Sequence, residues 1–163
     1  MKKKYLYLLV CMALILIILI GCGTENTDQP AVTTDWKPTT YETVNNFEGV
    51  TMTVKEGTAS PAGLTIVFEN NSESQCIYGE YFLLEKKISG NWFQVPVAIE
   101  GNYGFNDIGY DLASGEDSEW EAIWDWLYGS LGTGEYRIVK DVHDFRGTGE
   151  YDTYYLAAEF TID

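Results

Sequence analysis

The segment Leu131-Gly-Thr-Gly-Glu-Tyr-Arg-Ile138 places a tyrosine two residues after a glycine, at the opening of an apolar strand late in the chain. In Greek-key β-sandwiches a tyrosine at this place turns its hydroxyl back to a backbone group a few residues upstream and fastens the corner. The pattern predicts a tyrosine corner, with Tyr136 as the corner residue and Gly134 in the turn. The alternative is an ordinary glycine-containing turn followed by a strand tyrosine.

Short segments in which apolar and polar residues alternate lie upstream and downstream of this corner. Val50-Thr-Met-Thr-Val54 has apolar side chains at even positions and threonines at odd ones. Such alternation is typical of a strand with one buried face. It recurs with Leu64, Ile66 and Phe68, with Phe82, Leu84 and Ile88 in a segment spanning 78–88, and with Leu156, Ala158, Phe160 and Ile162 near the C-terminus.

The spacing of these segments predicts the fold class. Ser89-Gly-Asn91 leads into Trp92-Phe-Gln-Val95, so the segments before and after this turn are expected to form a hairpin. After the first 22 residues, no stretch keeps a helical period for three turns. About seven or eight short strands in a domain of this size are typical of a two-sheet sandwich. We therefore expect an all-β fold, an antiparallel β-sandwich with Greek-key connections.

Tryptophans and tyrosines gather just before the corner. Trp120, Trp124 and Trp126 share one parity, so on a strand they would line a single face, with Tyr128 close behind. The favoured interpretation is that this face is core, with Trp92 opposite, because aromatic residues dominate the buried area of sandwiches. The alternative is an exposed platform that stacks on sugar rings or on a partner's apolar patch.

The N-terminus has the layout of an export signal. Met1-Lys-Lys-Lys4 is followed by an uncharged, almost wholly apolar run from Tyr5 to Ile20, which is the pattern of a signal peptide. The run ends in Leu19-Ile-Gly-Cys22, which resembles the lipobox of bacterial lipoproteins. We expect cleavage after residue 21 and lipidation of Cys22, which would hold the protein on the outer face of the membrane of a Gram-positive bacterium. The alternative is an uncleaved anchor, and both place the rest of the chain outside the cytoplasm.

Composition divides the remaining chain into a tether and one domain. Residues 22–46 are rich in Thr, Asn and Asp and offer little apolar surface apart from Trp36 and Tyr41. Such a segment is expected to be a flexible linker, because burial cannot offset the entropy of ordering it. Residues 47–163 have the size of a single domain with its own core.

Charge narrows the class of partners. Removal of residues 1–21 takes three of the ten basic residues and none of the 25 acidic ones, which leaves a formal charge of −18. Nucleic acid and anionic lipid surfaces are poor partners for such a domain, since binding to both requires positive charge. The charge indicates a soluble and monomeric head, and a cationic partner or Ca²⁺ is compatible with it.

Cysteine and histidine are too few for common catalytic or metal sites. Cys11 leaves with the signal and Cys22 is modified, so Cys76 is expected to be a small buried hydrophobic residue and the fold to lack an internal disulfide. His143 is the only histidine, no Gly-x-Ser-x-Gly motif is present, and His143 is expected to be a solvated residue at the end of a strand. We expect no enzymatic activity, no metal site and no cofactor.

Several of these motifs, taken in order, resemble the bacterial immunoglobulin-like domain found in lipoproteins of clostridia and related Gram-positive bacteria. The resemblance covers most of residues 47–163 and includes Val50–Val54, Asn70-Asn-Ser72, Tyr78–Lys86, Gly90-Asn-Trp92 and Gly134–Ile138. It implies an extracellular immunoglobulin-like sandwich without established enzymatic activity.

Three functions are consistent with these observations. The first is a non-catalytic interaction module on a lipid anchor, with an undefined protein partner. The second is a glycan- or cell-wall-binding module that uses surface aromatic residues. The third is an inhibitor or immunity-type lipoprotein.

Overall fold

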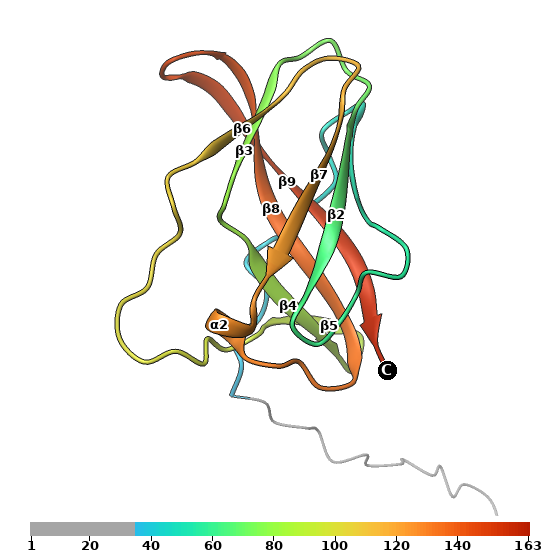
Figure 1. The fold of residues 1–163 in the computed structure, drawn as a ribbon, viewed down its shortest axis with the longest axis vertical. Coiled ribbons are helices and arrows are strands. Elements are labelled where there is room, and N and C mark those ends of the chain that lie inside the picture. Colours follow the sequence, from blue (N-terminus) through green and yellow to red (C-terminus); the bar gives the residue numbers. More distant parts are fainter. Residues whose placement is uncertain (1–34) are drawn as a thin grey trace, which may run out of the picture. The chain divides into compact units, whose positions relative to one another are not determined.

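Nine strands and one short helix make up the part of the chain that the structure describes. The structure is a computed structural model and describes residues 35–163, so the predicted signal peptide and Cys22 lie outside the described residues. Within residues 35–163, no helix is long and apolar enough to span a membrane. The elements, shown in Figure 1, are β1 (Val50–Val54), β2 (Gly63–Asn70), β3 (Cys76–Gly79), β4 (Leu83–Ile88), β5 (Asn91–Gln94), β6 (Gly109–Leu112), β7 (Asp117–Ile123), α2 (Asp125–Tyr128), β8 (Gly134–Gly147) and β9 (Glu150–Ile162).

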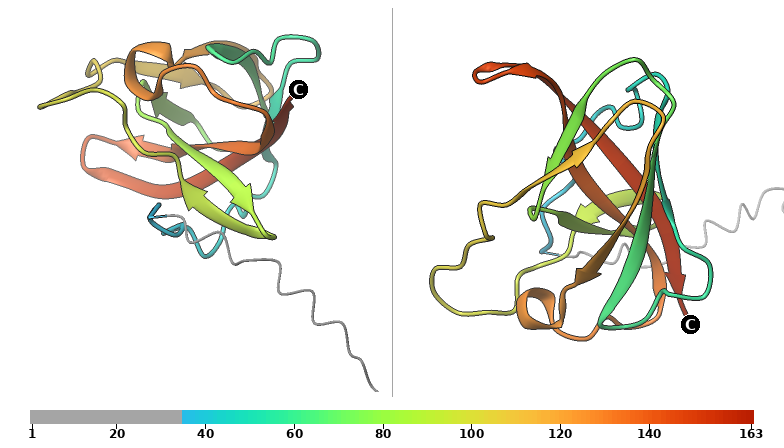
Figure 2. Two further views of the ribbon diagram at one scale, coloured as in Figure 1. Left: turned by 90° about the horizontal axis from the view of Figure 1, so that it is seen from below. Right: turned by 45° about the horizontal axis from the view of Figure 1, so that its top comes forward.

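The strands form two antiparallel sheets, as the alternation predicted. The smaller sheet has the order β1-β2-β7, and the larger has the order β5-β4-β8-β3-β6, with β9 also paired to β8. Figure 2 shows the sheets as two layers, and the tip of the β8–β9 hairpin extends beyond the rest of the sandwich. The predicted hairpin is β4–β5, in which Lys86 pairs with Phe93. Its turn uses Ser89 and Gly90 at positive φ, which is the backbone of a two-residue hairpin loop.

The core lies between the layers and consists of the apolar positions of each alternating strand. Ile66 and Phe68 of β2, together with Ile138 and Val142 of β8, have no exposed surface. The Phe68 ring stacks on Tyr78 of β3 across the layers, with centroids 4.3 Å apart. Burial of each such side chain contributes roughly 1.5–3 kcal/mol, so the sandwich is held by packing.

The segment 78–88, which the sequence predicts as one strand, is two strands. β3 ends at Gly79 and β4 begins at Leu83, although both pair with β8. A lysine of β8 occupies the gap, because the Lys140 ammonium donates to the carbonyl oxygens of Gly79 at 2.6 Å and Tyr81 at 2.8 Å. These two bonds satisfy carbonyl groups at the point where the regular ladder is interrupted.

The corner before β8 has the geometry of a tyrosine corner. The Tyr136 hydroxyl donates to the carbonyl oxygen of Gly132 at 2.8 Å. Gly134 has a φ of +148°, and a Cβ there would lie 2.7 Å from Cε of Lys86. Only glycine fits this turn without displacing the lysine, which explains the Gly-Glu-Tyr pattern.

Residues 36–45 are ordered against the sandwich, and we call this segment the strap. At one end the backbone of Lys37 accepts from Gln94 N at 2.8 Å, and Thr39 N donates to Trp92 O at 3.0 Å. At the other end the Asn45 side chain bonds to both the N–H and the C=O of Ala157, at 2.8 and 3.0 Å.

The expectation of a flexible linker is therefore wrong from residue 36 to residue 45. Composition measures only how much apolar surface a segment can bury. The strap is held instead by backbone groups on β5 and β9, which no composition count includes. Trp36 adds an apolar contact with the core.

Candidate functional site

Three of the four aromatic residues are buried, as the favoured interpretation of this face as core expected, so the alternative of an exposed platform on Trp120, Trp124, Trp126 and Tyr128 is wrong. Trp120 and Tyr128 are each 7% exposed and Trp124 is fully buried, whereas Trp126 is 44% exposed. Strand β7 ends at Ile123, so the parity that would align the tryptophans stops there, and Trp126 lies in helix α2. Trp124 is a core residue: its indole N–H donates to Pro61 O at 2.8 Å and its ring stacks on Phe160.

A different set of aromatic residues reaches the surface, and we call it the aromatic ridge. Neighbouring rings lie within contact distance: Tyr155 and Tyr41 have centroids 4.9 Å apart, Tyr81 and Phe105 5.4 Å, and Phe105 and Trp126 5.7 Å. The side chains of Tyr41 and Tyr81 interact with each other, and burial raises the pKa of both. Five rings thus form a continuous series from β9 to α2.

Sequence reasoning missed the ridge because its residues come from five separate parts of the chain. One signal was present: Tyr81 has the opposite parity to the core residues Phe82 and Leu84. That parity indicates a side chain directed away from the core. No spacing rule brings Tyr41, Phe105 and Trp126 beside it.

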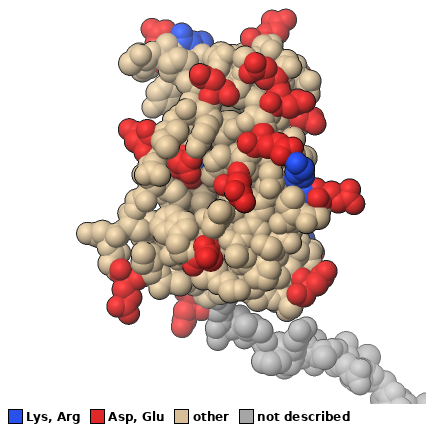
Figure 3. All heavy atoms as spheres, in the orientation of Figure 1, with Lys and Arg blue, Asp and Glu red and all other residues tan. Residues whose placement is uncertain are grey.

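A groove of about 400 Å³ lies along the ridge, and we call it the acidic groove. Its apolar lining includes Tyr81, Phe105 and Ile108, and its polar lining includes the carboxylates of Glu80, Asp107 and Asp141 together with His143. Asp and Glu far outnumber Lys and Arg on the face drawn in Figure 3. The groove therefore combines aromatic surface with negative charge.

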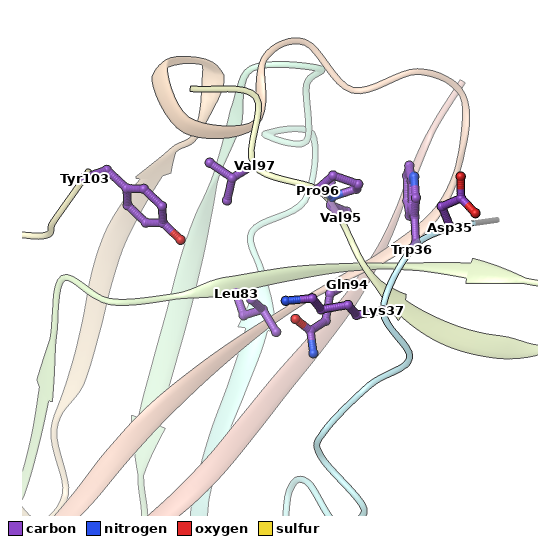
Figure 4. Close-up of a pocket in the computed structure, with 9 residues that line it drawn as sticks. All are labelled: Asp35, Trp36, Lys37, Leu83, Gln94, Val95, Pro96, Val97 and Tyr103. Carbon is purple, nitrogen blue, oxygen red and sulfur yellow. The ribbon is translucent and has the colours of Figure 1, made fainter. Parts of the chain in front are cut away.

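A second cavity, of about 350 Å³, lies where the strap crosses the start of the loop between β5 and β6, and we call it the strap pocket. Figure 4 shows Tyr103 and Trp36 at opposite ends, with Val97 and Pro96 between them. Its full lining is Asp35, Trp36, Lys37, Leu83, Gln94, Val95, Pro96, Val97 and Tyr103. Aromatic ends with a few polar groups are common in sites for small molecules.

A buried ion pair fixes the strap to the larger sheet. Glu85 of β4 is fully buried, and its Oε2 lies 2.6 Å from Nη2 and 2.6 Å from Nε of Arg137 in β8. Nη2 of Arg137 also donates to Thr39 Oγ1 at 3.1 Å, and its guanidinium lies 4.6 Å from the centre of the Trp92 ring. The pair therefore positions the strap and supplies no reactive group.

The ammonium of Lys140 is the most perturbed cation of the fold. It points into the sandwich and lies 3.8 Å from the centre of the Trp120 ring. Burial lowers the pKa of Lys140 to about 8, partly opposed by the charges of Asp141 and Glu80. The cation is tolerated because two carbonyl oxygens and the indole face replace its water.

Cys76 and His143 form no catalytic or metal centre in the described part of the chain. Cys76 is buried and unpaired, as predicted, and burial raises the pKa of its thiol to about 11, which disfavours the reactive thiolate. His143 lies within β8 and not at its end as expected; its side chain is 28% exposed, 3.5 Å from Asp141. Residues 35–163 contain no group of three or more His, Cys, Asp or Glu residues arranged to hold a metal.

Two antiparallel sheets closed by a tyrosine corner define an immunoglobulin-type β-sandwich. The chain belongs to the family of bacterial Ig-like domains, which it matches over residues 46–161. Among solved structures it is similar to an ASH/PapD-like domain of human CEP192 (PapD-like domain 7), with 16% identity, coverage of 81% of this chain and 95% of that chain, and a TM-score of 0.36. No curated protein matched the sequence.

Proposed function

We propose that this protein is a lipid-anchored extracytoplasmic lipoprotein whose bacterial Ig-like domain is a non-catalytic interaction module. The observation that carries the interaction role is the aromatic ridge, in which Tyr81, Trp126 and Tyr155 are 45, 44 and 38% exposed. Tyrosine and tryptophan are enriched among the residues that dominate binding energy at protein interfaces.

The anchor is the part of the proposal that rests on Cys22 and the preceding lipobox-like residues. In cells expressing the full chain, a radioactive fatty acid is expected to label the wild type and to leave Cys22→Ala unlabelled. Membrane fractionation is expected to move the Cys22→Ala protein from processed, membrane-bound material to unprocessed precursor. Equal labelling of the two proteins would contradict lipidation at this residue.

The strap pocket supports glycan binding as a second function. Trp36 and Tyr103 at its ends offer flat faces for sugar rings, and Gln94 and Asp35 offer groups that bond to hydroxyls. Soluble peptidoglycan fragments are expected to shift tryptophan fluorescence and to bind roughly tenfold more weakly to Tyr103→Ser than to the wild type. Tyr151→Ser is the matched control, because Tyr151 is equally exposed but lies on the β8–β9 hairpin, outside the pocket. No retention and unshifted fluorescence would contradict this function.

A further inference from the structure

The aromatic ridge and the acidic groove share residues, so they form one surface. Tyr81 and Phe105 belong to both. Tyr81 and Ile108 are 45 and 46% exposed at the groove, and Trp126 extends the surface towards α2. Monomeric proteins seldom leave a contiguous apolar surface of this kind uncovered unless it binds something.

The Phe105 ring at the centre of this surface is held in place by neighbouring side chains in the absence of a partner. Phe105 lies edge-on to Phe82 at 5.4 Å and to Trp126 at 5.7 Å. The Trp126 indole N–H donates to Ile123 O at 3.0 Å, and the Tyr81 carbonyl oxygen accepts from Lys140. A surface fixed in this way loses little side-chain entropy on binding, which favours affinity.

The negative charges of the groove favour a partner with positive charge. Glu80, Asp107 and Asp141 line it, and Oδ1 of Asp141 is buried with no hydrogen-bond partner within the described residues. The cation beside them is a weak competitor, because Lys140 is fully buried and bonded to two carbonyl oxygens. Carboxylates beside exposed rings suit a guanidinium, which donates hydrogen bonds to carboxylate oxygens and at the same time stacks on aromatic faces.

We propose that the acidic groove and the aromatic ridge bind a basic, extended segment of a partner protein, in which arginine or lysine residues alternate with apolar ones. The apolar side chains pack against Tyr81, Phe105 and Ile108, and the cationic side chains reach Glu80, Asp107 and Asp141. This inference rests on the proposed interaction function and specifies the chemistry of its partner.

The test uses the detergent-solubilised full chain and three fluorescein-labelled octapeptides, with binding followed by fluorescence anisotropy. The alternating Arg-Leu peptide is expected to bind, the Glu-Leu peptide to show no binding, and the Arg-Ser peptide to bind roughly tenfold more weakly than Arg-Leu. Binding of the Arg-Leu peptide is expected to weaken as salt rises from 50 to 500 mM, because exposed charges are screened.

Matched variants locate the site on the surface. Asp107→Asn is expected to weaken Arg-Leu binding by roughly threefold to tenfold, whereas Asp117→Asn removes the same charge on β7, outside the groove, and leaves binding within about twofold. Tyr81→Ser is expected to cost at least roughly tenfold, and Tyr103→Ser, in the strap pocket, to cost much less. Circular dichroism verifies that each variant keeps the wild-type Tm.

Three results would overturn the inference: no binding of the Arg-Leu peptide, equal binding of the Glu-Leu peptide, or equal weakening by a variant and its control. None of them bears on anchoring, because fatty-acid labelling of Cys22 tests that separately. Retention on glycans through Tyr103 with no peptide binding would assign the interaction to the strap pocket and overturn a basic protein segment as the partner.

Discussion

Arg137→Met is expected to lower the free energy of unfolding by about 3–5 kcal/mol, measured by urea denaturation at pH 7. The variant leaves the Glu85 carboxylate fully buried without its only cation, and Oε1 of Glu85 already has no hydrogen-bond partner among the described residues. A buried charge that loses its counterion keeps the whole cost of desolvation. The same change removes the donor to Thr39 Oγ1, so the strap loses one hydrogen bond while its backbone bonds to β5 and β9 remain.

The double variant Glu85→Gln with Arg137→Met is the control for this prediction. Removing both charges relieves the uncompensated carboxylate, so the double variant is expected to be more stable than Arg137→Met alone. The difference isolates the electrostatic cost from lost packing of the guanidinium on Trp92. Two results would contradict this prediction: Arg137→Met lowers the free energy of unfolding by less than about 1 kcal/mol, or the double variant is less stable than Arg137→Met alone. Either result would mean that the buried pair does not stabilise the contact between β4 and β8.

The sandwich itself was predictable because its information is local. Leu64, Ile66 and Phe68 are buried at alternate positions along β2, and alternation of this kind follows directly from the geometry of a strand with one buried face. The corner at Tyr136 was predictable for the same reason, since its hydroxyl bonds only four residues upstream. A contact between residues a few positions apart can be predicted from the sequence pattern around it.

The strap and the ridge were not predictable because they depend on distant contacts. Asn45 bonds to the backbone of Ala157, 112 residues away, and nothing in a Thr- and Asn-rich segment distinguishes an asparagine with such a partner from a solvated one. The tryptophan parity failed for a related reason. One residue beyond β7 the chain turns into α2, and a period-two rule applied across that boundary puts Trp126 on the wrong face.

The burial of Lys140 also depends on residues distant in the sequence. Even-numbered neighbours Ile138 and Val142 point into the core, so alternation places Lys140 there too, against the strong preference of lysine for solvent. The conflict is resolved by the gap between β3 and β4, which supplies two carbonyl oxygens to the ammonium. The buried ammonium of Lys140 and the gap between β3 and β4 therefore occur together, because the carbonyl oxygens at the gap bind the ammonium.

Lys140→Met is therefore expected to destabilise the fold in a pH-dependent way. At pH 7 the variant loses about 2–4 kcal/mol, because the carbonyl oxygens of Gly79 and Tyr81 lose their donor. The wild type gains further stability at higher pH: the folded pKa of Lys140 is about 8 and its ordinary value is 10.5, so in this window the unfolded chain binds more protons. Between pH 7 and about 9.5 the gain from this group is about 2 kcal/mol, and the variant lacks it.

The measurement is the difference in unfolding free energy between wild type and Lys140→Met, taken by urea denaturation at pH 7, 8.5 and 9.5. Cys76 acts in the opposite direction, since its raised pKa makes the folded thiol harder to ionise and costs stability above pH 9. That contribution is common to both proteins and cancels in their difference. The difference is expected to widen steadily with pH. A constant difference would mean that the Lys140 ammonium keeps its ordinary pKa, and that the face of Trp120 and the two carbonyl oxygens replace its water completely.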